Sequence, residues 1–205
     1  MIRDLLNDYF DTGKMPKLQK EEDPFWDPEE GHLIGYAYLY LKSLGYMLDN
    51  QNDCKIMNAN FKQKLGTLSV GVIPTDETGE ADMCPEELWV DDSSELIGKS
   101  IDFNIIIEKA SGLPENLCKD TYVEYSWNFE NYGTKIVTGV DINPKFGYKY
   151  HMKIDYVTED LLKYFETDAI TFKVYGNQTS TKLRKKLTQK EPKEESKNGT
   201  YQTRY

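Results

Sequence analysis

The segment Asp23–Asp49 reads DPFWDPEEGHLIGYAYLYLKSLGYMLD and joins a proline-framed aromatic pair to the most hydrophobic run of the chain. Each proline fixes its own φ and biases the preceding residue toward extended backbone, so a stiff turn presents Phe25 and Trp26. Two interpretations stay open for this pair: it plugs the edge of a hydrophobic core, or it is a docking anchor for a partner. The run at residues 35–40 suits a strand packed on both faces, although periodicity alone also allows a helix.

The bulk composition indicates a folded protein rich in strands. The chain has 205 residues, of which 39% are hydrophobic and 15 are tyrosines. This length predicts one domain with extensions, and tyrosine favours strands over helices. The formal net charge of -10 makes the bulk of the chain a poor partner for nucleic acid or for an anionic membrane, because both are densely negative.

The charge is distributed unevenly. From Lys182 to Tyr205 there are eight basic residues and three glutamates, so a basic segment follows an acidic body. Hydrophobic residues are rare beyond Thr179. Such a polar stretch buries too little apolar surface to offset the conformational entropy that is lost on ordering. A basic, disordered tail is therefore predicted at residues 181–205.

Alternating apolar and polar residues recur between turn signals along the chain. Strands are predicted at residues 54–58, 65–73, 101–108, 121–127, 148–156 and 169–175, a partner strand opening at residues 136–137, and a helical turn or two at residues 160–165. Pro74 is expected to end the second strand. We therefore predict a mainly β fold, an antiparallel β-sandwich with short helices, at residues 23–180, after an N-terminal helix and linker at residues 1–22.

No group of residues suggests a catalytic centre. Gly98-Lys99-Ser100 matches the end of a phosphate-binding loop, but Ser93 stands where the first glycine belongs, and a strand is predicted to follow where that loop needs a helix. The two histidines, His32 and His151, are far apart, and the carboxylates are scattered over loops. We expect no catalytic residue and no cofactor.

Metal and disulfide sites are not predicted either. Cys54, Cys84 and Cys118 are widely spaced and form no C-x-x-C pair, which favours a reducing, cytosolic compartment. Calcium sites in β-sandwich loops need several converging carboxylates. Asp120 is the one candidate ligand, and the loop at residues 176–179 adds no carboxylate, so we expect no metal.

Several short motifs occur in a fixed order along the chain. They are KEEDPFWDP at residues 20–28, LIG at 33–35, LKSLGYMLD at 41–49, GTLSV at 66–70, ELIGK at 95–99, NPKF at 143–146 and VYGNQ at 174–178. Together they resemble the non-motor region of kinesin-3 motors, which follows the motor and forkhead-associated domains. The resemblance covers roughly residues 2–180.

The resemblance implies a C2-like β-sandwich within a plus-end-directed microtubule motor that carries membrane-bound cargo or works around axonemes. It also implies that ATP hydrolysis belongs to a motor domain, whose phosphate loop and switch motifs this chain lacks. An enzyme is therefore the least favoured class for these residues.

Two functional hypotheses remain. The first is a non-catalytic interaction or regulatory module that binds a protein adaptor, other motor domains or microtubules, in the cytoplasm at the cytoskeleton or in a cilium. A stand-alone microtubule-associated adaptor is its alternative. The second is attachment to an anionic membrane or to tubulin tails through Lys182, Arg184, Lys185 and Lys186, each supplying roughly 1 kcal/mol near an anionic surface. The simpler interpretation of that charge run is a solvated linker.

Overall fold

The computed structural model describes Phe10, Gly13, residues 31–80 and residues 84–179. The chain separates into two units, residues 1–30 and 31–205, and the fold described below belongs to the second. The helix and linker predicted at residues 1–22 lie outside the described residues apart from Phe10 and Gly13, and the tail predicted at residues 181–205 lies wholly outside them.

Nine strands and four short helices make up the described part of the second unit. In chain order they are β1 (His32–Tyr40), the 3-10 helix η2 (Lys42–Tyr46), β2 (Asn50–Met57), β3 (Lys64–Thr75), the 3-10 helices η3 (Glu86–Leu88) and η4 (Ser93–Leu96), β4 (Ile101–Ser111), β5 (Lys119–Trp127), β6 (Glu130–Gly133), β7 (Val137–Val140), β8 (Lys145–Ile154), α2 (Glu159–Thr167) and β9 (Ala169–Asn177).

β1 confirms that the tyrosine-rich run is a strand and not a helix. Its side chains alternate between two faces: Ala37 and Leu39 are buried, whereas Tyr36 and Tyr38 are only half-buried on the opposite face. This alternation is the period of two that a strand imposes. One face of the strand therefore points into the core and the other presents tyrosine rings.

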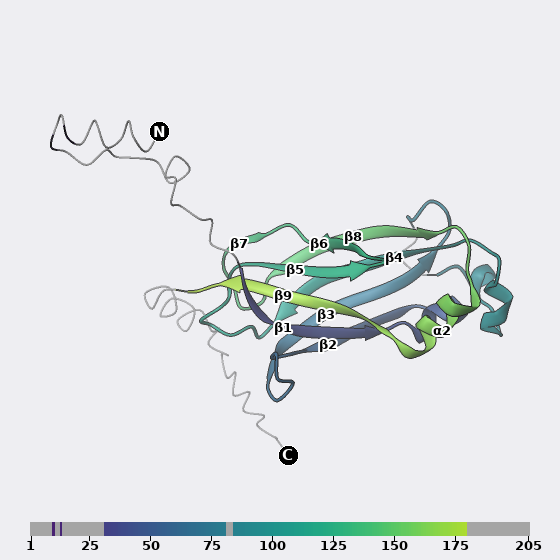
Figure 1. Cartoon of the computed structure of the whole chain (residues 1–205), viewed down its shortest axis with the longest axis horizontal. Coiled ribbons are helices and arrows are strands. Elements are labelled where there is room, and N and C mark those ends of the chain that lie inside the picture. Colours follow the sequence, from purple (N-terminus) through teal and green to yellow (C-terminus); the bar gives the residue numbers. More distant parts are fainter. Residues whose placement is uncertain (1–9, 11–12, 14–30, 81–83, 180–205) are drawn as a thin grey trace, which may run out of the picture. The chain divides into compact units, whose positions relative to one another are not determined.

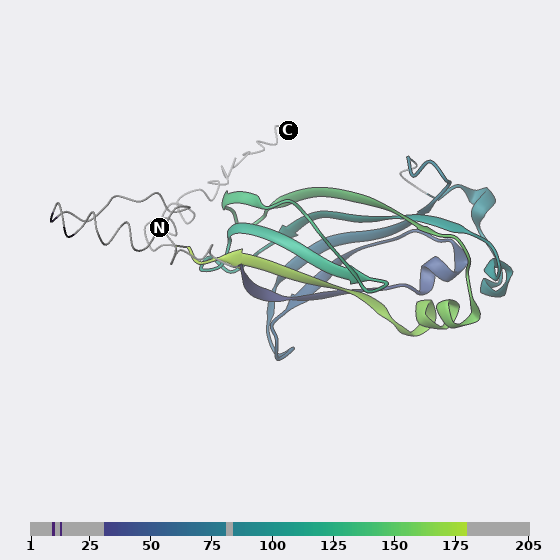
Figure 2. The same ribbon diagram turned by 45° about the horizontal axis from the view of Figure 1, so that its top comes forward.

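All strand pairs are antiparallel and run in the order β6-β5-β9-β1-β2-β3-β4-β8, with β7 also paired to β5. The β1–β2 pair keeps a single register position, Tyr36 with Met57, whereas the other long neighbours pair over most of their length. The sheet bends at this weak pair and curls so that two layers face each other (Figures 1 and 2). The predicted antiparallel β-sandwich is confirmed.

The core lies between the layers and is dominated by aromatic and β-branched side chains. Phe103 of β4 meets Trp127 of β5 edge to face, with ring centroids 5.4 Å apart, and Tyr125 packs on Phe172 of β9 at 5.5 Å. Phe103, Phe172 and Tyr125 are at most 1% exposed. Aromatic pairs of this geometry add to the free energy gained by burying their area.

Tyrosine side chains join β5 and β6, at one end of the strand order, to β8 at the other end. The hydroxyls of Tyr125 in β5 and Tyr148 in β8 lie 3.1 Å apart, and the rings of Tyr132 in β6 and Tyr150 in β8 lie 4.9 Å apart. Burial, followed by the hydrogen bond with Tyr148, raises the pKa of Tyr125 well above its usual value. Side chains thus close a seam where no backbone ladder runs.

The predicted helical turn becomes α2, which covers one end of the sandwich. The Thr158 hydroxyl caps it by accepting from the Leu161 amide, and Glu159 and Asp160 occupy the first turn, where acidic residues favour the helix dipole. Phe165 points from α2 into the core and is 1% exposed. Within the described residues, no helix is long and apolar enough to cross a membrane.

The expectation that Pro74 ends its strand is wrong. β3 runs through Pro74, which pairs with Phe103 of β4, to Thr75. β2 pairs with β3 only as far as Val72, so no second neighbour requires the amide hydrogen that proline lacks. β6 was not foreseen, and β8 ends at Ile154, two residues before its predicted end.

Replacing Phe103 with alanine should lower the free energy of unfolding by about 3–5 kcal/mol, because a buried aromatic ring is lost and the cavity cannot close. Urea denaturation followed by circular dichroism measures this. Tyr40→Ala is the matched control, since Tyr40 is 67% exposed and its removal should change stability by about 0.5 kcal/mol or less. Equal losses in both variants would contradict the assignment of the core.

The tyrosine seam predicts a loss of stability at alkaline pH. A tyrosine ionises near pH 10 in an unfolded chain, whereas Tyr125 in the folded protein stays neutral to higher pH. Its contribution is therefore fully present below pH 10 and is lost as the pH rises through the folded-state pKa. Between pH 8 and pH 10.5–11, the urea midpoint should fall more for the wild type than for Tyr125→Phe. Parallel slopes would show that Tyr125 titrates normally.

Candidate interaction surface

The side chains that the sequence nominated for contacts with partners all lie outside the described residues. They are Phe25, Trp26, Lys182, Arg184, Lys185 and Lys186. Their roles stay predictions. The described residues form other surfaces, which the sequence did not single out.

The turn between β5 and β6 carries a fully exposed phenylalanine. Trp127 pairs with Glu130, so Asn128 and Phe129 form a two-residue hairpin loop, and their φ values of 47° and 66° both lie in the left-handed region. A loop with this pattern favours glycine at its second position. Left-handed backbone costs a residue with a side chain roughly 1–2 kcal/mol. Phe129 therefore occupies a strained position, with its ring in solvent.

Phe129 stands at the rim of a groove, named here the Phe129 groove, between the β5–β6 hairpin, the end of β8 and α2. Its volume is about 700 Å³, within the range of ligand-binding clefts. The lining residues are Trp127, Asn128, Phe129, Glu130, Tyr132, Met152, Lys153, Ile154, Asp155, Tyr156, Leu161 and Tyr164.

The core fixes the floor of the Phe129 groove. Trp127 is 9% exposed and packs edge to face against Phe103 and against Tyr164 of α2, with centroids 5.4 and 5.9 Å apart. Tyr156, by contrast, is 62% exposed beside this floor. Rigid aromatic surface next to exposed aromatic rings is typical of residues that dominate the energy of protein interfaces.

Acidic side chains flank the groove. Glu130 and Asp155 are exposed lining residues, and Lys153 is the basic one among them. Glu130 accepts a hydrogen bond of 2.7 Å from the Tyr132 hydroxyl, which raises the pKa of Tyr132 to about 12. The groove therefore combines an aromatic floor with a rim on which negative charge prevails.

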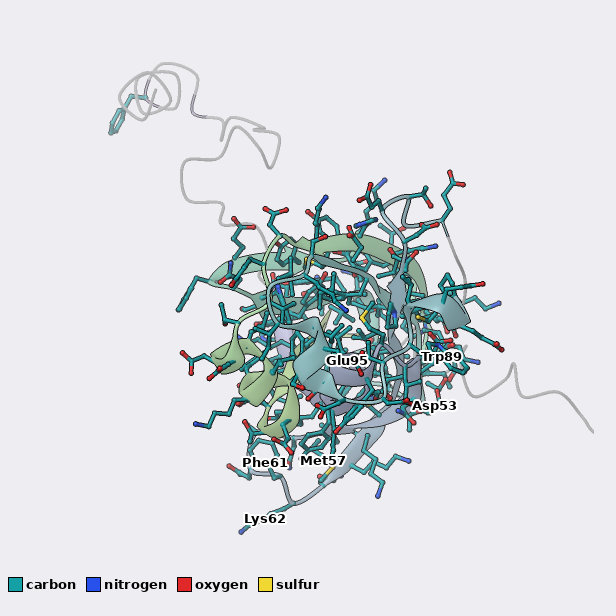
Figure 3. All side chains as sticks on the ribbon, turned by 90° about the vertical axis from the view of Figure 1, so that its right-hand side faces the viewer. Asp53, Met57, Phe61, Lys62, Trp89 and Glu95 are labelled. Carbon is teal, nitrogen blue, oxygen red and sulfur yellow. The ribbon has the colours of Figure 1, made fainter. Side chains whose placement is uncertain are left out.

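At the end of the sandwich near α2, exposed carboxylates outnumber the exposed lysines, which are Lys42, Lys99, Lys153 and Lys163. Figure 3 looks onto this end and labels Glu95 and Trp89 on it. The exposed carboxylates of the segments there are Asp76, Glu77, Glu80, Glu86, Glu87, Asp91, Asp92, Glu95, Asp155, Glu159, Asp160, Glu166 and Asp168. Clustered like charges create a potential that attracts cationic partners and repels anionic ones.

A second exposed phenylalanine, Phe61, provides a useful contrast with Phe129. It lies between β2 and β3, has a φ of 55° and is 54% exposed. Its ring packs on Tyr36 and Tyr38 of β1, with centroids 6.1 and 6.0 Å away, and Figure 3 shows it beside Met57 and Lys62. The ring of Phe61 therefore has neighbours within its own domain.

A part-buried histidine–aspartate pair that no sequence pattern predicts joins β4 and β8. His151 Nε2 lies 2.7 Å from Asp102 Oδ1, and the backbone of Gly79 stands against His151 Nδ1. The Asn104 amide also donates to the Gly79 carbonyl at 2.9 Å. The Asn104 bond and the close approach of Gly79 to His151 hold the loop after β3 against the sheet. His151 and Asp102 are 49 residues apart in the chain, so no local sequence pattern predicts their contact.

The remaining candidates from the sequence occupy structural positions. Gly98 and Lys99 connect η4 to β4, as predicted for a turn before a strand. Asp120 Oδ1 accepts from the Gly139 amide at 2.7 Å, and its Oδ2 lies 3.4 Å from Lys119 Nζ. No group of three or more potential metal-binding side chains is found in the described part of the chain.

All three cysteines are free thiols. Burial, with Asp49 nearby, raises the pKa of Cys84 to about 11, and burial also raises the pKa of Cys54 and Cys118. A raised pKa keeps a thiol protonated and therefore unreactive near neutral pH.

Replacing Phe129 with glycine should stabilise the domain by roughly 1 kcal/mol, because glycine adopts the left-handed region without strain and the exposed ring makes no compensating packing. Chemical denaturation of Phe129→Gly beside the wild type measures this. Phe61→Gly is the matched control and should gain less, since it also loses the contacts with Tyr36 and Tyr38. A destabilised Phe129→Gly variant would show that the ring supports the fold.

Comparison with protein-family models gives no match. Among individual proteins, the chain is 25% identical to the kinesin-like protein KIF28P of Homo sapiens over 182 residues, which are 87% of this chain and 18% of that protein. It is 28% identical to the kinesin-like protein KIF28 of Rattus norvegicus over 78% of this chain and 16% of that protein. It is 29% identical to kinesin-related protein 1 of Dictyostelium discoideum over 82% of this chain and 8% of that protein.

The chain thus spans less than a fifth of the length of the curated relatives it matches. The matches cover most of this chain. Over most of its length, the chain is related to a region of kinesin-like proteins.

Proposed function

We propose that this chain is a non-catalytic interaction module of a kinesin-3-like microtubule motor, with a C2-like sandwich that binds a protein partner in the Phe129 groove. Its relation to kinesin-like proteins over most of its length supports the link to a motor. The observation that carries the binding role is Phe129 itself. A bulky residue in strained backbone, without packing in its own domain, is characteristic of a contact made with another molecule.

The magnitudes favour a binding role for this residue. Retaining phenylalanine in left-handed backbone costs roughly 1–2 kcal/mol. Fully burying a phenylalanine side chain that was exposed is worth about 1.5–3 kcal/mol. Contact with a partner therefore offsets the strain, whereas the isolated domain gains nothing from the ring.

The partner in this proposal is a protein adaptor or another part of the motor, and the module positions the motor relative to it in microtubule-based transport, at the cytoskeleton or in a cilium. The acidic end of the sandwich disfavours nucleic acid and anionic membranes as occupants of the groove. Any ATP hydrolysis resides in a motor domain. The alternative is a stand-alone adaptor that binds microtubules directly.

Affinity capture tests the proposal. The 205-residue chain is immobilised as wild type, Phe129→Gly and Phe61→Gly, and proteins captured from cytosol are quantified and then titrated in purified form. We expect a partner of micromolar or better affinity that Phe129→Gly binds at least tenfold more weakly and that Phe61→Gly binds normally. Co-sedimentation with microtubules distinguishes the two proposals. A stand-alone adaptor is expected to pellet with microtubules in the absence of any other protein.

The stability of the variants keeps this test interpretable. Phe129→Gly is expected to be at least as stable as the wild type, so lost capture cannot be ascribed to unfolding. Equal capture by wild type and Phe129→Gly, or the absence of any partner at micromolar concentrations, would refute the proposed role.

A further inference from the structure

We infer that the ligand of the Phe129 groove is a basic polypeptide segment that carries bulky apolar side chains. This inference rests on the proposed function and adds the chemistry of the partner. Two independent features of the groove lead to it: an apolar floor that is fixed before binding, and a rim and surroundings dominated by exposed carboxylates.

The floor of the groove favours a ligand with apolar side chains. Trp127 and Met152 are 9% and 6% exposed, and Trp127 is held by Phe103 and Tyr164. Such a floor needs no rearrangement to accept aliphatic side chains, which lowers the entropic cost of binding. Phe129 at the rim can then close over what is bound.

The carboxylates at the rim of the groove favour a ligand with positive charge. Glu130 on the hairpin and Asp155 after β8 line the groove with exposed side chains, and the exposed Glu159 and Asp160 precede its lining residue Leu161 in the first turn of α2. Lys153 is the basic residue of the lining and is outnumbered by these carboxylates. Electrostatic complementarity speeds association and excludes partners of like charge, so a lysine- or arginine-rich segment fits and an acidic one does not.

A sequence of this chemistry occurs in the chain itself. Residues 181–187 read TKLRKKL, in which Leu183 and Leu187 stand four residues apart among Lys182, Arg184, Lys185 and Lys186. In a helix, residues four apart share one face, so both leucines could enter an apolar groove while the basic side chains meet the rim.

Chain length prevents this segment from filling the groove of its own domain. Tyr125 pairs with Phe172, so Trp127 is level with the start of β9, whereas the described chain ends at Thr179 beyond the other end of that strand. The strand between these points spans about 23 Å at 3.3 Å per residue. Leu183 follows Thr179 by four residues and can reach at most about 14 Å from it. Both leucines can therefore enter such a groove together only when the segment comes from another polypeptide.

A synthetic peptide of residues 179–190, TSTKLRKKLTQK, is the probe, titrated with the full-length chain and followed by fluorescence anisotropy. We expect binding in the micromolar range at 50 mM salt, weakened at least threefold at 300 mM salt because the rim contacts are screened. Phe129→Gly should reduce affinity at least tenfold, and Phe61→Gly should leave it unchanged. A peptide with both leucines replaced by serine should bind at least tenfold more weakly.

Each result decides the inference. No binding at 1 mM peptide in low salt, equal affinity for Phe129→Gly, or equal binding of the leucine-free peptide would overturn it. Concentration-dependent self-association by light scattering, abolished by Phe129→Gly, would support it with a second copy as the source of the segment. If the peptide fails while partner capture still depends on Phe129, the proposed function stands and only the partner's chemistry is wrong.

Discussion

The edge-to-face contact between Phe103 and Trp127 is the interaction on which the described structure depends. It joins β4 in one layer to β5 in the other, and Trp127 extends the contact to Tyr164 on α2. The curled sheet, the helix at its end and the floor of the Phe129 groove therefore share one aromatic cluster. A side chain that stabilises the core thus also gives the groove its rigidity.

The β5–β6 hairpin contributes both to the tyrosine seam and to the Phe129 groove. Along the seam, Tyr125 and Tyr132 meet Tyr148 and Tyr150 of β8, and Tyr125 is fully buried there. At the end near α2 the seam opens, and aromatic side chains face solvent among carboxylates. Tyr125 and Trp127 of β5 stabilise the core, whereas Phe129 lies in the loop beyond the strand, which is why it can be changed without threatening the core.

The strands were predictable because each half-buried strand repeats every two residues, and β1, β4, β5, β8 and β9 all appear near their predicted positions. β6 was missed because four residues are too few to show a period. The Phe129 turn was missed for a different reason: such hairpins are usually announced by Asn-Gly, and this chain has Asn128 followed by Phe129. A phenylalanine in a sequence suggests a buried side chain, and only the structure shows that the Phe129 ring is exposed.

The sequence alone determined where most strands lie, that the body is acidic and that its cysteines are unpaired, because these properties depend on local periodicity, composition and spacing. The tertiary structure decided which edges meet, that His151 finds Asp102, and that an aromatic groove opens beside Phe129. Those features arise from contacts between residues far apart in the chain, whose register depends on the curl of the sheet and not on any local pattern.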